Sequence, residues 1–447
     1  MLFVPDAPPT ETPGPTPEPT VEPTAAPTAE PTPEPSETPL PTPTPTPTPT
    51  PGTDPTTLDL PRIPWEGGSA YWKNFRAADG AGWDDPSFFP IVIWFNGISS
   101  DAEVQYDKSV GINTYVGMWE GTNYQLFEDN DVYFIGDKLN DTFTDSSRNW
   151  VGSFLGDEID GRYSAEEGHA LLDAARKANA GSGRFDYSNY TQIVVSTDGD
   201  QSSAERYVND YSDVASLDMY WYTIPYCDWK PYRGDTYLQP INEANCRTAS
   251  SYGKTVEMMR ERDRADGKLQ PIWQFVENLN GGPGEDAPAV YIEPGQLEGA
   301  VMSSVINEAR GIVYFNQSLS GDCRGSSVVR QSQGDDGFCG SAQVKASAHV
   351  NGQIAELAPV LNSQSYDYTF GPDLDTMLKT YDGSAYVFAM VDGESSPGQR
   401  TFALPAGVNG RSVEVVGEDR SIAVGADGTF TDSFAAEYSY HIYRIAL

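Results

Sequence analysis

Histidine is scarce in this sequence, and the residues needed for several common kinds of catalysis are missing. The three histidines, His169, His349 and His441, do not follow any predicted buried strand. The sequence therefore lacks histidines in the positions that a histidine-based metal site or a Ser-His-Asp triad requires. Neither a glycine-rich phosphate loop nor a nucleophile elbow occurs. We therefore expect no cofactor and no histidine-held metal; a calcium site built from loop carboxylates stays open.

Basic residues are also few. The chain has 28 Lys and Arg against 65 Asp and Glu, which gives a net charge of −37. The eight acids among the first 58 residues account for part of it, so about −29 belongs to the rest of the chain. Such a charge repels phosphates and anionic membrane surfaces. No apolar run approaches the roughly 20 residues of a membrane span. We expect a monomer that binds neither nucleic acid nor membranes.

Residues 1–58 contain no Lys or Arg but hold 20 of the 35 prolines. Thr and Pro alternate from Pro41 to Pro51, and proline cannot donate the hydrogen bonds of a helix or sheet. This segment is therefore predicted to be a disordered Pro/Thr-rich linker of polyproline character.

Only four cysteines occur, and they form two local pairs. Cys227 and Cys246 flank one predicted loop, and Cys323 and Cys339 flank another. An even count in such pairs predicts two disulfides and an oxidising compartment, with four free thiols as the alternative. Together with the linker, this predicts a secreted protein, although Met1-Leu2-Phe3-Val4-Pro5 is too short for a signal peptide.

Residues 59–364 alternate between short apolar runs and amphipathic stretches, which is typical of a (β/α)8 barrel. A doubly wound sheet is the alternative, but the glycine-rich turn that it needs after its first strand is missing. The predicted strands cover residues 88–96, 112–119, 132–137, 151–155, 191–196, 214–222, 271–276 and 311–315.

Residues 365–447 have a different pattern of apolar and turn-forming residues. Short alternating strands are separated by Gly, Pro and Asp at intervals of about 8–12 residues, a spacing that predicts a small antiparallel β-sandwich. The predicted strands cover residues 386–391, 400–404, 412–416, 421–424, 429–430 and 438–445.

Two of the barrel's apolar runs end abruptly in carboxylates. The run from Trp150 leads into Asp157 and Glu158, and the run from Pro271 leads into Glu277. Catalytic residues of (β/α)8 barrels stand at the carboxyl ends of the strands. Two carboxyl groups brought together there are what glycoside hydrolysis requires.

In this respect the chain resembles the clan of retaining (β/α)8-barrel glycoside hydrolases. That resemblance implies that Glu158, after the fourth strand, is the acid/base and that Glu277, after the seventh, is the nucleophile. Asp157 occupies the place where the clan usually has a sugar-binding Asn. Tyr220 and Tyr222 are candidates for the residue that contacts the nucleophile. The clan's aromatic floor of the sugar site has only Tyr314 and Phe315 near its usual place.

Further aromatic and amide side chains are predicted near strand ends, where they would contact a carbohydrate substrate by stacking or by hydrogen bonds. The predicted contacts of this kind are Asn96, Trp119, Trp273 and Gln274.

The sequence thus predicts a secreted retaining glycoside hydrolase that acts on a poly- or oligosaccharide. Three alternatives stay open. The barrel could bind carbohydrate without catalysis, or it could belong to another clan that uses a pair of Asp residues. Asp157 could also be the acid in place of Glu158.

Overall fold

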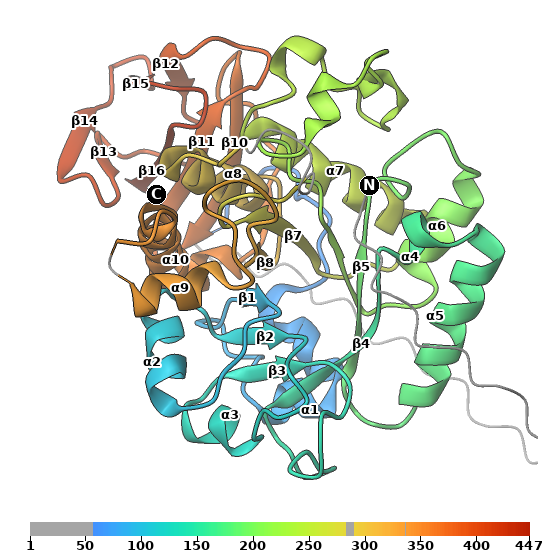
Figure 1. Cartoon of the computed structure of the whole chain (residues 1–447). Helices are drawn as coiled ribbons and strands as arrows, with labels where there is room; N and C mark the ends of the chain where they lie inside the picture. Colours follow the sequence, from blue (N-terminus) through green and yellow to red (C-terminus); the bar gives the residue numbers. More distant parts are fainter. Residues whose placement is uncertain (1–56, 283–289, 336) are drawn as a thin grey trace, which may run out of the picture. The chain divides into compact units, whose positions relative to one another are not determined.

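The computed structural model describes residues 57–282, 290–335 and 337–447, and within them eight parallel strands close into a barrel (Figure 1). The predicted (β/α)8 fold is therefore confirmed. Each strand pairs with the next along the chain, and the last pairs with the first. The strands are β1 (Ile91–Trp94), β2 (Thr114–Val116), β3 (Tyr133–Ile135), β4 (Trp150–Asp157), β5 (Phe185–Tyr190), β6 (Val214–Leu217), β7 (Ile272–Glu277) and β8 (Ile312–Phe315).

Helices surround the barrel, and several begin at side-chain caps. Ser164 and Glu167 form a reciprocal capping box at the start of the helix over 165–179. Ser100 and Asp200 cap the helices that follow them. The α-helices are α1 (Arg76–Gly80), α2 (Asp101–Ser109), α3 (Gln125–Asp129), α4 (Ile159–Arg162), α5 (Ala165–Asn179), α6 (Gln201–Asn209), α7 (Ser250–Asp263), α8 (Pro294–Ile306), α9 (Val328–Gly334) and α10 (Ser341–Leu361). The 3-10 helices are η1 (Gly68–Asn74), η2 (Pro225–Asp228), η3 (Gly234–Thr236), η4 (Glu243–Asn245) and η5 (Arg264–Asp266).

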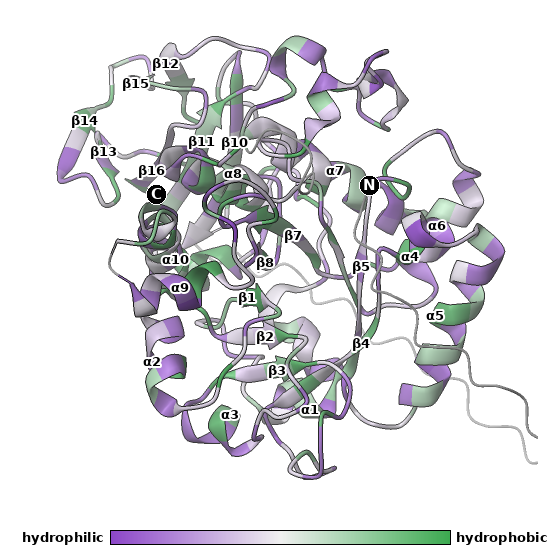
Figure 2. Cartoon of the chain, viewed as in Figure 1, coloured by the Kyte–Doolittle hydropathy of each residue, from purple (hydrophilic) through white to green (hydrophobic). Residues whose placement is uncertain are grey.

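Hydrophilic and hydrophobic residues alternate along α5 and α6 (Figure 2). The side chains of the barrel strands are mostly buried. No helix within the described residues is long and apolar enough to cross a membrane.

The segment before β1 packs into the barrel's interior. Trp72 of η1 and Trp83 lie with their rings 4.7 Å apart and belong to the same apolar cluster as the inward-facing side chains of the strands. Both rings also lie within 6.5 Å of the ring of Trp273, near the start of β7. The aromatic lead-in therefore fills the amino end of the barrel, and the carboxyl ends of the strands are left for a site.

One predicted strand is wrong. The apolar run over 191–196 is a turn, and β5 is instead the more polar stretch Phe185–Tyr190. Polar side chains of β5 are buried because they hydrogen-bond to neighbouring strands: Tyr187 to Ser216, and Asn189 to Asp157. Val194 and Val195 are buried among the outer helices. Apolarity alone therefore pointed to the wrong segment.

The C-terminal region forms the predicted antiparallel sandwich. A six-stranded sheet in the order β14-β13-β16-β11-β10-β9 packs on the two-stranded sheet β12-β15. Its strands are β9 (Ser365–Tyr366), β10 (Leu374–Tyr381), β11 (Ser384–Val391), β12 (Gly398–Ala403), β13 (Ser412–Val415), β14 (Arg420–Ala423), β15 (Thr429–Phe434) and β16 (Tyr440–Ala446).

Both faces of the larger sheet are covered. Along β11, Phe388 and Met390 belong to the core that the barrel helices share, whereas Val387 and Val391 belong to the sandwich core. This alternation follows the two-residue period of a strand. The sandwich therefore has an apolar core of its own, and the other face of its larger sheet joins the core of the barrel next to α8 and α10 (Figure 1).

Residues 1–56 of the predicted linker lie outside the described residues. Leu58, at the linker's predicted end, is buried in the sandwich core, and its backbone N–H donates to the hydroxyl of Tyr366. The folded part of the chain therefore includes Leu58.

Candidate active site

The carboxyl ends of three barrel strands bring together four acidic side chains, which we call the rim carboxyls: Asp157, Glu158, Asp218 and Glu277. Asp157 and Glu277 are the last residues of β4 and β7, and Glu158 and Asp218 directly follow β4 and β6. Parallel strands in a closed barrel all end on one face, so these side chains share the same opening.

Glu158 is held in a strained position. Its backbone is left-handed, with φ 47° and ψ 35°, a conformation that non-glycine residues seldom adopt outside special sites. This turn starts α4, which directs Arg162 back toward the strand end. Arg162 Nε lies 3.1 Å from Glu158 Oε2, and its Nη2 lies 2.7 Å from Asp157 Oδ2. Glu158 is 6% exposed, so most of its surface is covered by the protein.

Asp157 is fixed by the neighbouring strands. Asn189 Nδ2 of β5 donates to Asp157 Oδ1 at 2.9 Å, and Asn189 Oδ1 accepts from Ser216 of β6 at 2.8 Å. Burial raises the pKa of Asp157 to about 6, and the hydrogen bond from Asn189 acts in the opposite direction.

Asp218 was missed by the sequence analysis. It directly follows β6 and is 7% exposed. Burial first, and then the charge of Glu158, raise the pKa of Asp218 well above its ordinary value. The prediction carried the sixth strand to residue 222. Ending it at Leu217 would have placed an acid directly after an apolar strand, the signal that identified Glu158.

Glu277 is completely buried, with 0% exposure. Its carboxyl group accepts hydrogen bonds from Thr223 Oγ1 at 3.0 Å and from the hydroxyl of Tyr252, which lies 2.9 and 2.7 Å from its two oxygens. Burial raises the pKa of Glu277 to about 7, whereas these hydrogen bonds lower it.

Two tyrosines connect the carboxyls electrostatically. The charges of Glu158, Asp218 and Glu277 all help to raise the pKa of Tyr220 and of Tyr226, and burial is the largest cause in both. Glu158 and Glu277 stand at the carboxyl ends of strands of the same closed barrel, so both belong to the face that forms its mouth.

Of the predicted substrate contacts, Trp119 is the most accessible. Its side chain is 61% exposed, and its ring lies against the loop after β1. A Cβ at Gly97 would come within 2.2 Å of Trp119 Nε1, so glycine is required there. Tyr222 is buried, and its hydroxyl donates to Glu437 of the sandwich at 2.7 Å. Tyr220 packs against Phe315 with the rings 5.1 Å apart.

Three other predicted contacts lie in the protein core. Trp273 is the second residue of β7 and packs near the amino end of the barrel, as described above. Tyr314 faces the outer helices, where its hydroxyl donates to Asn351 of α10 at 2.7 Å. Gln274 is fully buried, and its Nε2 donates to the carbonyl oxygen of Phe275. The structure does not bring these side chains to the rim carboxyls.

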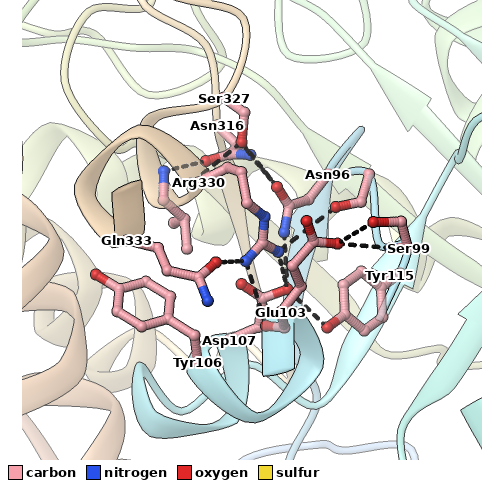
Figure 3. Close-up of polar contacts among 12 residues, drawn as sticks. Asn96, Ser99, Glu103, Tyr106, Asp107, Tyr115, Asn316, Ser327, Arg330 and Gln333 are labelled. Atoms are coloured by element: carbon pink, nitrogen blue, oxygen red, sulfur yellow. Dashed lines mark hydrogen bonds and ion pairs between the residues drawn. The ribbon is translucent and has the colours of Figure 1, made fainter. Parts of the chain in front are cut away.

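Asn96 belongs to a buried polar network between the first and last strands (Figure 3). Its Nδ2 donates to Asp107 Oδ2 at 2.9 Å, and its Oδ1 accepts from Asn316 and Ser327. Arg330 of α9 pairs with Asp107 at 2.7 Å. The side chain of Asn96 is therefore engaged in joining α2 and α9 to the strand ends.

Both predicted disulfides are present. Cys227 bonds to Cys246 in the segment after β6, and Cys323 bonds to Cys339 in the segment after β8. Each closes a loop on the face that carries the rim carboxyls. Among the described residues, no group of three or more His, Cys, Asp or Glu is arranged to hold a metal ion.

No protein-family model matches the sequence, and a search of curated proteins finds no match. Solved structures with a similar fold include a GH30 endoxylanase from Clostridium papyrosolvens C71, with 11% identity, a TM-score of 0.41, and coverage of 80% of this chain and 97% of that one. The noncanonic maltogenic alpha-amylase AmyB from Thermotoga neapolitana has 10% identity, a TM-score of 0.42, and coverage of 80% and 99%. An alpha-amylase from Geobacillus thermoleovorans has 10% identity, a TM-score of 0.39, and coverage of 80% and 98%. The function of this chain is therefore inferred from its own residues.

Proposed function

We propose that this chain is a secreted glycoside hydrolase that cleaves O-glycosidic bonds of a poly- or oligosaccharide with retention of configuration. The observation that carries the proposal is that two buried glutamates, Glu158 and Glu277, stand at the carboxyl ends of β4 and β7 in one closed barrel. A retaining enzyme needs two carboxyl groups about 5–5.5 Å apart, one that protonates the leaving oxygen and one that attacks the anomeric carbon.

Glu277 is proposed as the nucleophile. The hydroxyls of Thr223 and Tyr252 donate to its carboxyl group and hold it in one orientation. The nucleophile must be ionised, and the pKa of Glu277 is about 7 in the free protein. Activity should therefore rise with pH through about 7 on its acidic side.

Glu158 is proposed as the acid/base. In the first step its proton passes to the glycosidic oxygen while the carboxylate of Glu277 bonds to the anomeric carbon, and the alcohol leaves. In the second step Glu158 takes a proton from water, the oxygen of that water bonds to the anomeric carbon, and the bond to Glu277 breaks. Asp157 and Arg162 hold the end of β4 while this happens.

The exposed ring of Trp119 is proposed as a stacking surface for the sugar, and the carbohydrate is the expected partner. The disulfides support export to an oxidising compartment. We also propose that the protein works as a monomer.

A screen of plant, fungal and bacterial wall polysaccharides tests the proposal, with products analysed by NMR at early times. The expected result is hydrolysis in which the anomer formed first has the configuration of the substrate. Inversion would contradict the assignment of Glu277 as nucleophile. Binding of a polysaccharide without any hydrolysis would favour the alternative of a non-catalytic carbohydrate-binding barrel.

A further inference from the structure

The turn between β15 and β16 of the sandwich packs against the barrel. The backbone N–H of Ala436 donates to the Ser439 hydroxyl at 2.9 Å, and the N–H of Ser439 donates to the carbonyl oxygen of Ala436 at 3.1 Å. Tyr438 lies directly on α8, where a Cβ at Gly295 or at Gly299 would come within 2.6 Å of it. The two glycines therefore let the turn approach the helix closely.

Glu437, within this turn, joins two separate segments of the barrel. Its Oε1 accepts from the hydroxyl of Tyr222 at 2.7 Å, and its Oε2 accepts from the backbone N–H of Ala249 at 2.9 Å. Tyr222 belongs to the segment after β6, and Ala249 directly precedes α7. N–H groups at the start of a helix have no partner within the helix, so the Glu437 carboxylate satisfies one of them.

The same two segments meet again at Tyr252 of α7. The backbone N–H of Tyr222 donates to the Tyr252 hydroxyl at 3.1 Å, and that hydroxyl donates to Glu277, lying 2.9 and 2.7 Å from its two oxygens. A phenol has one proton to donate. Because the Tyr222 N–H already donates to the phenol oxygen, the phenol proton is directed at the Glu277 carboxyl group.

One side chain of the sandwich thus binds both parts on which this contact depends. Glu437 holds Tyr222 by its hydroxyl, and it holds α7 by its first residues. Ala249 lies three residues before Tyr252, which is about one turn of helix. A displacement of either segment would therefore change the hydrogen bond between the Tyr222 N–H and the Tyr252 hydroxyl.

We propose that Glu437 is a positioning residue for the nucleophile: it holds Tyr222 and the start of α7 together and so keeps the Tyr252 hydroxyl directed at Glu277. This inference rests on the proposed function, in which Glu277 attacks the anomeric carbon. The sandwich thereby supports the active site in addition to packing against α8 and α10.

The test is the steady-state kinetics of Glu437→Ala on a substrate from the screen. The variant loses both hydrogen bonds, so the Tyr252 hydroxyl and Glu277 are held less well. We expect kcat to fall about tenfold and KM to change less than about twofold, because a misplaced reacting group slows the chemical step. The hydrogen bond from Tyr252 lowers the pKa of Glu277, so the acidic limb of kcat/KM should move up by about half a pH unit.

Glu437→Gln is the conservative variant. Its amide oxygen can accept from the Ala249 N–H, and its NH2 group can donate to the Tyr222 hydroxyl, since a phenol oxygen also accepts. We expect this variant to restore most of kcat and the original acidic limb. Glu414→Ala, at an exposed acid of the sandwich that pairs with Arg444, is the matched control and should change neither.

The double variant with Tyr252→Phe separates a specific link from a general loosening of the fold. If Glu437 acts through the Tyr252 hydroxyl, the acidic limb of the double variant should coincide with that of Tyr252→Phe. Additive shifts would overturn the link. If Glu437→Ala does not fold, Tyr222→Phe removes one of the two hydrogen bonds of Glu437 and should show a smaller upward shift. An unmoved limb in Tyr222→Phe would then overturn the link.

A titration without substrate keeps this inference separate from the proposed function. Infrared difference spectra of the free protein should contain a carboxyl component that titrates at about 7 and is missing in Glu277→Gln. Its midpoint should rise in Glu437→Ala and stay constant in Glu414→Ala. A rise without hydrolysis of any polysaccharide would support the link and overturn the proposed function. An unchanged midpoint and acidic limb in Glu437→Ala, with an inactive Glu277→Ala, would overturn the link and leave the proposed function intact.

Discussion

At the amino end of the barrel, acidic and basic side chains form one buried cluster, whereas at the carboxyl end four acidic side chains gather at the strand ends and Arg162 pairs with two of them, Asp157 and Glu158. The amino-end ion cluster consists of Glu66, Glu308, Arg310 and Lys379. Arg310 lies 3.2 Å from Glu66 and 2.8 Å from Glu308, and Lys379 Nζ lies 3.9 Å from Glu308.

The two groups respond to burial in opposite ways. Lys379 and Arg310 lower the pKa of Glu308 to about 2, so its ionised form stabilises the fold at all but acidic pH. Burial instead raises the pKa of Glu277 and of Asp218, so ionising them costs stability as pH rises above the ordinary carboxyl range. The buried ion cluster at the amino end therefore stabilises the fold when its acids are ionised, whereas ionisation of the buried Glu277 and Asp218 at the carboxyl end lowers the stability.

The largest expected effect on stability is at the amino end. Lys379→Met leaves Glu308 buried with one fewer cation, and breaking a buried pair costs about 3–5 kcal/mol. We expect the free energy of unfolding in urea to fall by about 3 kcal/mol, with kcat per folded molecule unchanged. Lys345→Met, at an exposed lysine of α10, is the matched control. Equal stability of the two variants would contradict the contrast between the two ends.

The sequence shows why this contrast was only partly predictable. Apolar runs that end in acids identified the strand ends at Glu158 and Glu277. The sequence near Glu308 shows only Arg310, two residues away, and does not distinguish a buried ion cluster from an exposed pair in a loop. The other members, Lys379 of β10 and Glu66, come from distant parts of the chain.

Strand register explains the remaining differences. Trp273 and Tyr314 were placed near the site because they occur on the seventh and eighth strands. Whether such a residue faces the mouth depends on its position along the strand and on which face of the sheet its side chain points to. A shift of one residue in the strand reverses that face. The same uncertainty about where the sixth strand ends hid Asp218.

At the carboxyl end, where repulsion between the rim carboxyls lowers the stability, the disulfides are expected to stabilise the fold. Replacing Cys227 and Cys246 by Ser opens a loop with a sequence separation of 19 residues. Chain entropy gives a loss of about 3 kcal/mol for a loop of that size. Thermal unfolding should show this loss, and activity should fall as well, since the loop follows β6. A variant that loses stability but keeps full activity would show that the loop does not shape the site.

Tyr252→Phe tests how the hydrogen bond from the Tyr252 hydroxyl affects the Glu277 carboxyl group. The variant removes a hydrogen bond that lowers the pKa of this carboxyl, so its pKa should rise. The acidic limb of kcat/KM should move up by about one pH unit, which corresponds to about 1.4 kcal/mol. Tyr291→Phe is the matched control, because that phenol bonds to the backbone near Cys323 and not to Glu277. If the acidic limb does not move, Glu277 is not the group whose ionisation sets it.

The smallest expected effect is at Trp119. Loss of an exposed stacking surface is worth about 1 kcal/mol, so Trp119→Ala should raise KM by about fivefold and leave kcat unchanged. Steady-state kinetics on the polysaccharide would measure both. A change in kcat with constant KM would instead place this ring next to the reacting bond.

If the buried carboxyls at the strand ends carry out hydrolysis, removal of the Glu277 carboxyl group must abolish it. This is tested by measuring kcat/KM of Glu277→Ala on a polysaccharide that the unmodified protein cleaves. Glu261→Ala, at an exposed position of α7, is the control. We expect a loss on the order of 10⁴-fold or more for Glu277→Ala and less than about twofold for the control. A Glu277→Ala protein that keeps a tenth or more of the original kcat/KM would contradict this expectation.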